Sequence, residues 1–320
     1  DGFINFNLNE KTPTIIKVIG VGGGGGNAVE YMYEKGICDV DFVICNTDYQ
    51  ALRNSPIPCK IQLGKELTAG HGAGNNPAMG EKSAQESLAD IEAILKKDTR
   101  MAFITAAMGG GTGTGAAPVI ARLSKDMGIL TVGIVSVPAR FEGPKRLDQA
   151  RDGLRRLKDH VDCLIVIDNE KIKSIYGSQT ISQAFAKAND VLNIAAKGIA
   201  EIITLPGYIN VDFADVRTVM TDSGGAIMGA AQASGEDRAI RAITEALESP
   251  LLNNNDILGA KDILLNITSG TDEITMDEMS QITSHIIRKV GNNAAVIWGV
   301  GTDPDLGDAV SVTIIATGFP

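Results

Sequence analysis

The sequence predicts an α/β fold: a Rossmann-like parallel sheet, a long central helix and a second α+β domain. Three observations predict it. Strand-like and helix-like segments alternate through the first half of the chain, glycine-rich runs follow two of the strands, and the alternation gives way to a different order after residue 206. The domains we expect are residues 1–178, a central helix at 179–206, and residues 207–320.

The first domain is predicted from its hydrophobic periodicity. Short β-branched runs predict strands, and longer runs with helical spacing separate them. Alternation of this kind favours a parallel sheet covered by helices on both faces, with ligands bound beyond the carboxyl ends of the strands. The expected strands are 14–19, 41–46, 101–107, 129–136 and 162–167, and the expected helices are 26–35, 80–97, 115–127 and 146–160.

The second half begins with a long stretch of small residues from Gln179 to Thr204, which predicts a helix that stops at Leu205-Pro206-Gly207. Beyond it, helices and strands no longer alternate regularly. We expect helices at 237–248 and 276–290, the latter with a capping box of Thr275 and Glu278, and strands at 216–220, 262–268, 294–300 and 310–317.

Composition excludes several classes of function. The 320 residues are 44% hydrophobic and 21% charged, with a net charge of −10 and no basic run, which argues against nucleic acid or an anionic membrane as partner. The four cysteines have no C-x-x-C spacing and the three histidines are scattered, so no metal site is predicted. No apolar run reaches the length of a membrane span, so we expect a cytoplasmic protein without membrane insertion.

Residues 109–115 read Gly-Gly-Gly-Thr-Gly-Thr-Gly, between the strand-like Met101–Met108 and the helix-like Ala116–Gly128. Glycines let several backbone N–H groups turn toward one ligand, and the start of the helix adds partial positive charge, so the run predicts a phosphate-binding loop. It is not a Walker A loop, because it contains no lysine. The alternative is a flexible linker, although linkers are rarely flanked so closely by a strand and a helix.

A second glycine run, 20–26, follows the first strand. Gly20, Gly22 and Gly25 fit the G-x-G-x-x-G pattern, and Asp48 follows the next strand where a ribose-binding carboxylate is expected. Alone, this pattern suggests an NAD-dependent oxidoreductase. Two phosphate-binding loops on one sheet instead favour a nucleotide with a polyphosphate tail. A further alternative is a structural filament protein that binds nucleotide without hydrolysing it.

The two glycine loops, the segment Asn210–Asp215 and the segment Ser234–Arg238 together resemble the FtsZ family of tubulin-like GTPases, the bacterial cell-division proteins. The resemblance extends from about Ile15 to Gly318, and Thr114 stands where tubulins have serine. It implies that GTP or GDP binds here, with Mg²⁺ held mainly by phosphates and water.

The resemblance implies a role for each matching position. Gly22, Gly23 and Asn27 would lie in the first phosphate and base loop, and Ala73 and Gly74 would lie over the γ-phosphate. Glu142 and Arg146 would hold the ribose and approach the phosphates, and Asn169 and Asn189 would bind guanine, with Phe185 stacking on its face. The α- and β-phosphates would be wrapped by Gly109, Gly110, Gly111, Thr112, Gly113, Thr114 and Gly115. An asparagine side chain both donates and accepts, as the edge of guanine requires, and Phe185 and Asn189 share a helix face. Without the resemblance, Phe185 could instead pack in the core, and Glu142 could be a solvated loop carboxylate.

The same resemblance assigns catalysis to Asn210, Asp212 and Asp215, of which the two aspartates could instead simply cap a helix. They follow the central helix while the phosphate loops precede it, and a helix of about 25 residues spans about 35–40 Å. The resemblance resolves this separation by head-to-tail assembly: the acidic loop of one subunit completes the site of the next. It further implies filaments in a mid-cell division ring, and membrane anchors and regulators that bind a C-terminal tail beyond Pro320.

Overall fold

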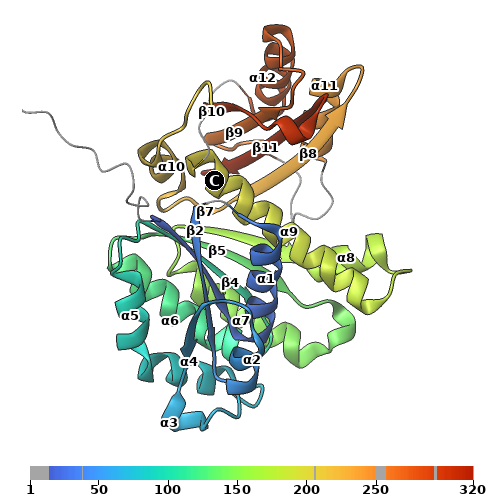
Figure 1. The fold of residues 1–320 in the computed structure, drawn as a ribbon. Helices are drawn as coiled ribbons and strands as arrows, with labels where there is room; N and C mark the ends of the chain where they lie inside the picture. The colour runs from blue at the N-terminus through green and yellow to red at the C-terminus, as the bar shows by residue number, and fades with distance from the viewer. Residues whose placement is uncertain (1–13, 38, 205–206, 249–256, 292–293, 320) are drawn as a thin grey trace, which may run out of the picture.

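The computed structural model describes residues 14–37, 39–204, 207–248, 257–291 and 294–319. Two layered units stand one above the other, and helix α9 (Ile181–Thr204) runs between them (Figure 1). Among the described residues, no helix combines the length and apolar character needed to cross a bilayer.

The lower unit is built on a seven-stranded parallel sheet with the strand order β3-β2-β1-β4-β5-β6-β7. The order reverses between β1 and β4, which is the arrangement of a doubly wound sheet, so the predicted fold class is confirmed. The sequence did not predict β3 or β7. β7 has two residues, and the second unit contributes it to the edge of the first unit's sheet. The strands are β1 (Ile16–Val21), β2 (Val40–Asn46), β3 (Cys59–Gln62), β4 (Met101–Ala107), β5 (Leu130–Val137), β6 (Cys163–Asp168) and β7 (Gly224–Gly225).

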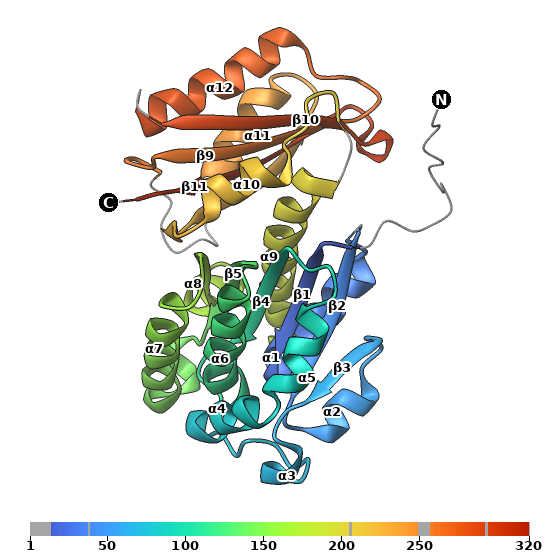
Figure 2. The ribbon, with the colours of Figure 1, turned by 90° about the vertical axis from the view of Figure 1, so that its left-hand side faces the viewer.

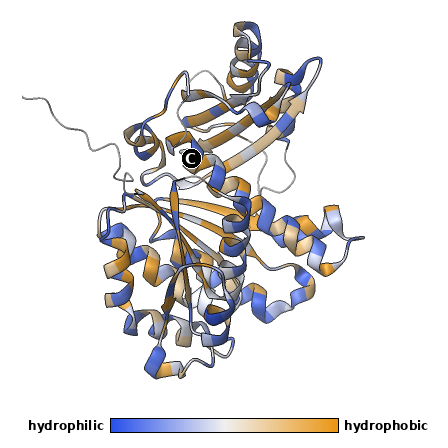
Figure 3. Ribbon diagram, viewed as in Figure 1, coloured by the Kyte–Doolittle hydropathy of each residue, from blue (hydrophilic) through white to orange (hydrophobic). Residues whose placement is uncertain are grey.

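Helices bury both faces of this sheet, and its central strands β1, β4 and β5 are accordingly apolar along most of their length (Figure 3). One face packs on α1 (Gly22–Lys35) and α9 (Ile181–Thr204), and α8 (Asn169–Tyr176) packs beside α9. The other face packs on α4 (Pro77–Glu86), α5 (Leu88–Leu95), α6 (Thr112–Asp126) and α7 (Pro144–Lys158). The short α2 (Tyr49–Asn54), α3 (Lys65–Thr68) and 3₁₀ helix η1 (Arg140–Glu142) lie in the connections.

Both glycine runs are more helical than the sequence indicates. α1 begins at Gly22 and α6 at Thr112, several residues before the expected starts. The reason is close packing of α1 on β4. A Cβ added to Gly24 would overlap Ala107, and one added to Gly25 would overlap the Thr105 carbonyl. Glycine therefore allows the first turns of α1 to approach the sheet, which outweighs its low helix propensity.

The helix predicted at 80–97 is in fact two helices, α4 and α5, which meet at Ser87. The Ser87 hydroxyl is engaged outside the helix: it accepts from Gly64 N–H at 3.1 Å and donates to the Gln62 carbonyl at 3.3 Å. A serine that bonds backbone groups in this way competes with continuous helix.

The second unit has a four-stranded mixed sheet, in the order β10-β9-β11-β8, with α11 and α12 on one face. Its strands are β8 (Ile227–Ser234), β9 (Asp262–Ser269), β10 (Ala295–Thr302) and β11 (Ala309–Thr317), and its helices are α10 (Phe213–Met220), α11 (Arg238–Leu247), α12 (Met276–Val290) and the 3₁₀ helix η2 (Pro304–Leu306). The capping box of Thr275 and Glu278 is confirmed.

The strand expected at 216–220 is wrong, because this segment is the second half of α10. The buried side chains of this segment lie on one face of a helix, because Val216, Val219 and Met220 are spaced by three and four residues. A strand would instead bury alternate residues. β8 was not predicted, since its run of small residues has little strand propensity. It forms by antiparallel pairing with β11.

Helix α9 connects the two units (Figure 2). Its 24 residues give a length of about 36 Å. Of the predicted stop signal Leu205-Pro206-Gly207, the first two residues lie outside the described residues. α9 contacts α1, β5 and β6 of the first unit and β8 of the second, so it lies between the segments that precede it and the loop at 207–212.

Candidate functional site

A cavity of about 420 Å³ opens at the carboxyl ends of β1, β4 and β5, where the strand order of the sheet reverses. Both glycine loops and the start of α9 line it. It brings together eleven of the predicted site residues: Gly23, Asn27, Gly110, Gly111, Thr112, Gly113, Glu142, Arg146, Asn169, Phe185 and Asn189.

The loop that begins at Gly109 leads directly into α6. Gly109 has a φ of 104°, which only glycine adopts readily, and its N–H donates to Thr114 Oγ1 at 2.8 Å. Thr114 is fully buried, so its hydroxyl accepts from the loop instead of lining the cavity. Gly115 also lies outside the cavity lining, and a Cβ there would overlap the Pro77 carbonyl. These two residues hold the loop, while Gly110–Gly113 face the cavity.

The first glycine loop packs against the second. Gly22 has a φ of 74°, and a Cβ at this position would lie 2.8 Å from the Gly113 nitrogen. The N-termini of α1 and α6 therefore meet at one cavity, where their free N–H groups and partial positive charges favour an anion. This pair of helix ends is the feature that best fits a polyphosphate.

Ala73 and Gly74 do not line the 420 Å³ cavity but lie in a loop against its wall. A Cβ on Gly111 would lie 2.7 Å from the Asn76 nitrogen and 3.0 Å from Ala73 Cβ, so the two loops touch. Gly74 has open space around it. The loop is thus placed beside the glycine nest, with room for a ligand to extend past it.

Thr47 connects these loops, a role that no sequence motif assigned to it. Its fully buried hydroxyl lies 2.7 Å from Thr112 Oγ1, and its carbonyl accepts from Gly72 N–H at 3.3 Å. The position of Thr47 at the carboxyl end of β2 was the available signal. Next to it, Asp48 caps α2 through bonds from the N–H groups of Gln50 and Ala51, so the carboxylate that suggested an NAD site serves a local helix.

The opposite end of the cavity suits a planar base. Phe185 keeps 45% of its surface exposed and is therefore not the core residue of the alternative interpretation. Asn169 Oδ1 is buried without a hydrogen-bond partner among the described residues. A buried carbonyl oxygen of this kind is satisfied by an N–H donor, such as one on the edge of a guanine base.

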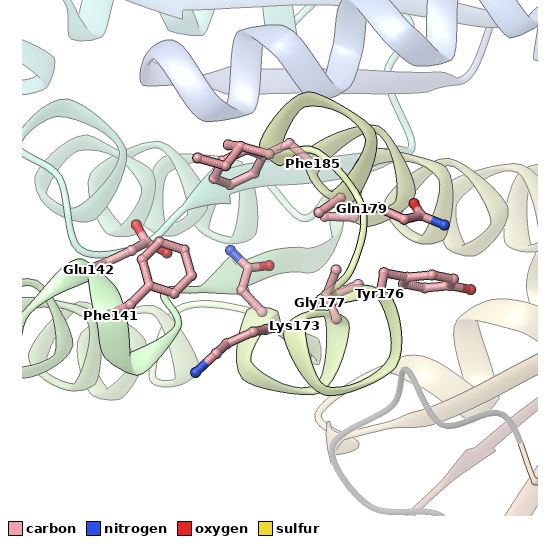
Figure 4. A pocket seen from close by; sticks show the side chains of 12 residues that line it. Phe141, Glu142, Lys173, Tyr176, Gly177, Gln179 and Phe185 are labelled. Atoms are coloured by element: carbon pink, nitrogen blue, oxygen red, sulfur yellow. The ribbon is translucent and has the colours of Figure 1, made fainter.

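A second cavity, of about 120 Å³, adjoins this end between α8 and the start of α9 (Figure 4). Asn169, Phe185 and Glu142 line both cavities, and the remaining walls of the second are mostly apolar. Glu142 and Phe141 lie at its rim (Figure 4). The cavity therefore continues into an apolar recess at the end that carries Asn169 and Phe185.

Glu142 is fixed rather than freely solvated. Its Oε1 accepts from Ala139 N–H at 3.0 Å, and its Oε2 forms a 3.0 Å ion pair with Arg146 Nη1. Arg146 remains half exposed. The pair places a carboxylate and a guanidinium on the same wall, suited to ribose hydroxyls and to phosphate oxygens respectively.

A side-chain hydrogen bond joins α1, which carries Asn27, to α9, which carries Asn189. The Tyr31 hydroxyl, one turn after Asn27 in α1, donates to Asp190 Oδ1 at 3.2 Å in α9. Burial, together with the Asp190 carboxylate, raises the pKa of Tyr31. This bond fixes the spacing between α1 and α9 beside the base-binding end.

The acidic loop is not part of this cavity. Asn210 and Asp212 follow the far end of α9, and Asp212 is the N-cap of α10. Asn210 Oδ1 accepts from Gly207 N–H at 2.6 Å, and Ile209 exchanges two backbone hydrogen bonds with Val300. Asp212 and Asp215 do cap a helix, as the alternative interpretation expected, and both side chains remain accessible at the surface.

Comparison with known proteins identifies relatives along the whole chain. Residues 15–177 match the GTPase domain of the Tubulin/FtsZ family, and residues 224–320 match the C-terminal domain of the FtsZ family. The chain is 50% identical to a cell division protein FtsZ of Porphyromonas gingivalis, over 100% of this chain and 70% of that protein. It is also 50% identical to the FtsZ of Buchnera aphidicola, over 95% of this chain and 79% of that protein.

A solved structure gives the same result for the fold. The empty FtsZ dimer of M. jannaschii superposes with a TM-score of 0.88 at 43% sequence identity, covering 96% of this chain and 89% of that one.

Proposed function

The chain belongs to the FtsZ family of tubulin-like cell-division GTPases, and on that premise we propose that two copies together form each GTP-hydrolysing site. One copy binds GTP in the 420 Å³ cavity. The second copy, stacked head to tail, supplies Asn210, Asp212 and Asp215. The observation that carries this proposal is that the acidic loop does not line the cavity. The cavity reaches α9 only as far as Leu192, and the remaining turns of the helix, about 18 Å, lie between it and the loop that carries Asn210, Asp212 and Asp215.

In the first copy, the triphosphate lies across the N-termini of α1 and α6, with the γ-phosphate toward Ala73 and Gly74. Glu142 and Arg146 hold the ribose and approach the phosphates. The base stacks on Phe185 and donates to Asn169 Oδ1, which otherwise lacks a partner. Asn189 completes recognition from the same face of α9 as Phe185.

Among the described residues, no three His, Cys, Asp or Glu side chains gather to hold a metal ion. We therefore propose that Mg²⁺ is bound mainly by phosphate oxygens and water. There it would offset the charge of the triphosphate. The chain itself contributes backbone N–H groups and the Arg146 guanidinium to the same end.

Hydrolysis is the attack of one water on the γ-phosphorus, with cleavage of its bond to the bridging oxygen of the β-phosphate and loss of the water proton. The incoming Asp212 and Asp215 carboxylates orient this water and accept its proton, and the Asn210 amide assists in their positioning. No residue lining the cavity of the first copy is placed as such an acceptor except Glu142, which is occupied by Ala139 and Arg146.

Head-to-tail contacts of this kind do not close, so copies add indefinitely and form filaments. Loss of the γ-phosphate removes a group that bridges the two copies, so the contact between them weakens. By family membership we propose that these filaments assemble in the cytoplasm into the mid-cell division ring, where anchors and regulators bind a segment beyond Pro320.

Mixing two inactive variants tests the shared site. Asp212→Asn retains the nucleotide cavity but lacks the acidic group, and Phe185→Ala with Asn169→Ala lacks base binding but retains the loop. Neither variant should hydrolyse GTP alone, and the mixture should recover activity at junctions where the loop of the second meets the cavity of the first. A mixture as inactive as its components would contradict a shared site. Recovered turnover in the mixture would also exclude the alternative of a filament protein that binds GTP without hydrolysing it.

A further inference from the structure

Arg238 is the most extensively bonded buried charge in the described part of the second unit. The residue is 5% exposed. Its guanidinium binds Glu278 through both Nε and Nη2, at 2.7 and 3.1 Å, and binds Asp272 Oδ2 through Nη1 at 2.9 Å. Two carboxylates thus compensate the buried cation, as such a group requires.

The same guanidinium also holds backbone. It donates to the carbonyls of Asp272, Glu273 and Asp308, at 3.1, 3.1 and 2.7 Å. The neighbouring turn closes against this segment, because Asp272 N–H donates to the Gly307 carbonyl at 3.1 Å. Arg238 therefore fixes the main chain at Glu273.

The Glu273 side chain extends from this fixed point to the acidic loop. The Tyr208 hydroxyl donates to Glu273 Oε1 at 2.9 Å, across 65 residues of sequence. This carboxylate raises the pKa of Tyr208, as expected when it holds the hydroxyl proton. Tyr208 is 69% exposed, so the bond does little for the core.

Tyr208 lies two residues before Asn210 and four before Asp212. After it, Ile209 is paired with Val300, and Asp212 begins α10. The segment between Gly207 and Asp212 is therefore held by Tyr208 at its start and by the α10 cap at its end.

We propose that the Tyr208–Glu273 hydrogen bond, anchored by Arg238, positions Asn210 and Asp212 for the site of the neighbouring copy. The inference rests on the proposed function of the acidic loop. Tyr208 and Glu273 are positioning residues in it, and neither contacts the nucleotide. Small displacements of reacting groups lower rates strongly, whereas loss of one exposed hydrogen bond leaves folding nearly unchanged.

A double-mutant cycle on the exposed pair tests this inference. The variants are Tyr208→Phe, Glu273→Ala and the double variant, with Glu273→Gln as the matched control that keeps an accepting oxygen. Arg238 is left in place, because its removal would strand Glu278 as an unpaired charge. For each variant, kcat is measured above the assembly threshold, and GTP affinity is measured by equilibrium binding.

We expect each single variant to lower kcat by about fivefold to tenfold, with GTP affinity within about twofold of the parent chain. The double variant should be no slower than either single variant, and Glu273→Gln should be close to the parent. An unchanged kcat in Tyr208→Phe would overturn the inference. So would effects that multiply in the double variant, since the hydroxyl would then act on something other than Glu273.

Failure of this inference is distinguishable from failure of the proposed function. If Asp212→Asn retains turnover, the acidic loop is not catalytic and the proposed function fails. If Asp212→Asn is inactive while Tyr208→Phe is as fast as the parent, only the positioning role fails.

Discussion

Asp212 and Asp215 cap the same helix reciprocally. Asp215 N–H donates to Asp212 Oδ1 at 2.8 Å, and Asp212 N–H donates to Asp215 Oδ2 at 3.3 Å. Each carboxylate thus commits one oxygen to the first turn of α10, and among the described residues the other oxygen has no hydrogen-bond partner. One pair of residues can therefore fix the helix start and present two carboxylate oxygens to a neighbouring copy.

Replacement of Asp212 by Asn should separate these two roles. Asparagine caps helices about as well as aspartate, so the unfolding free energy should hardly change. Turnover should fall by about a hundredfold or more, because the proton acceptor is lost, while GTP binding is retained. Phosphate release and equilibrium binding check this, and Asp212→Ala should additionally lose about 1 kcal/mol of stability. Equal losses of binding and turnover would contradict the assignment.

Two neighbouring glycines of α1 should respond oppositely to alanine. A Cβ at Gly26 meets nothing within 4 Å, so Gly26→Ala should stabilise the helix by up to about 1 kcal/mol. A Cβ at Gly25 overlaps the Thr105 carbonyl, so Gly25→Ala should destabilise the protein by about 1–3 kcal/mol. Denaturant unfolding of both variants measures the difference. A stable Gly25→Ala variant would show that α1 does not need its close approach to β4.

The Thr114 hydroxyl should matter as an acceptor within the glycine loop. Thr114→Val leaves the buried Gly109 N–H without its partner, which should cost about 1–3 kcal/mol in stability and weaken GTP binding. Thr114→Ser keeps the hydroxyl and is the matched control. Calorimetric titration with GTP compares them. If the serine and valine variants bind equally well, the hydrogen bond does not shape the loop.

The Arg238–Glu278 pair should make stability depend on pH. Hydrogen bonding to Arg238 holds the pKa of Glu278 below its ordinary value of 4.5. A lowered pKa in the folded state means that the pair contributes fully above the ordinary value. The contribution is lost as the pH falls below that value and through the lowered one.

Unfolding free energies of the parent chain and Glu278→Gln, compared from neutral pH to about pH 3, test this dependence. The difference between the two should shrink as the pH falls below 4.5. A difference that stays constant over this range would mean that Glu278 is not held in its charged form by Arg238.

The sheet of the first unit could be predicted from the sequence because its buried strands and intervening helices have distinct periods. The errors arise where tertiary contacts outweigh local preference. The segment 216–220 has the β-branched residues of a strand but is helical, since the Asp212 cap starts α10 four residues earlier. β8 has small residues and little local signal, and it forms only by pairing with β11.

In the candidate site, too, local sequence signals predicted some features, and contacts between distant segments determine the others. The glycine loops could be found from sequence because their residues are unusual and adjacent. The resemblance to a known family was needed to connect Glu142, Asn169 and Asn189 with them, since these residues come from three separate segments. For Thr47 the signal was only its position after a predicted strand. Arg238 and the Tyr208–Glu273 bond were beyond prediction, because ordinary side chains acquire their roles there only through contacts distant in sequence.

The most direct test of the central claim is phosphate release from GTP per subunit, measured over a series of protein concentrations. A site shared between copies predicts a specific rate near zero at low concentration that rises past a threshold. A specific rate independent of concentration would mean that one chain holds the complete site, and the role of Asp212 and Asp215 would be wrong.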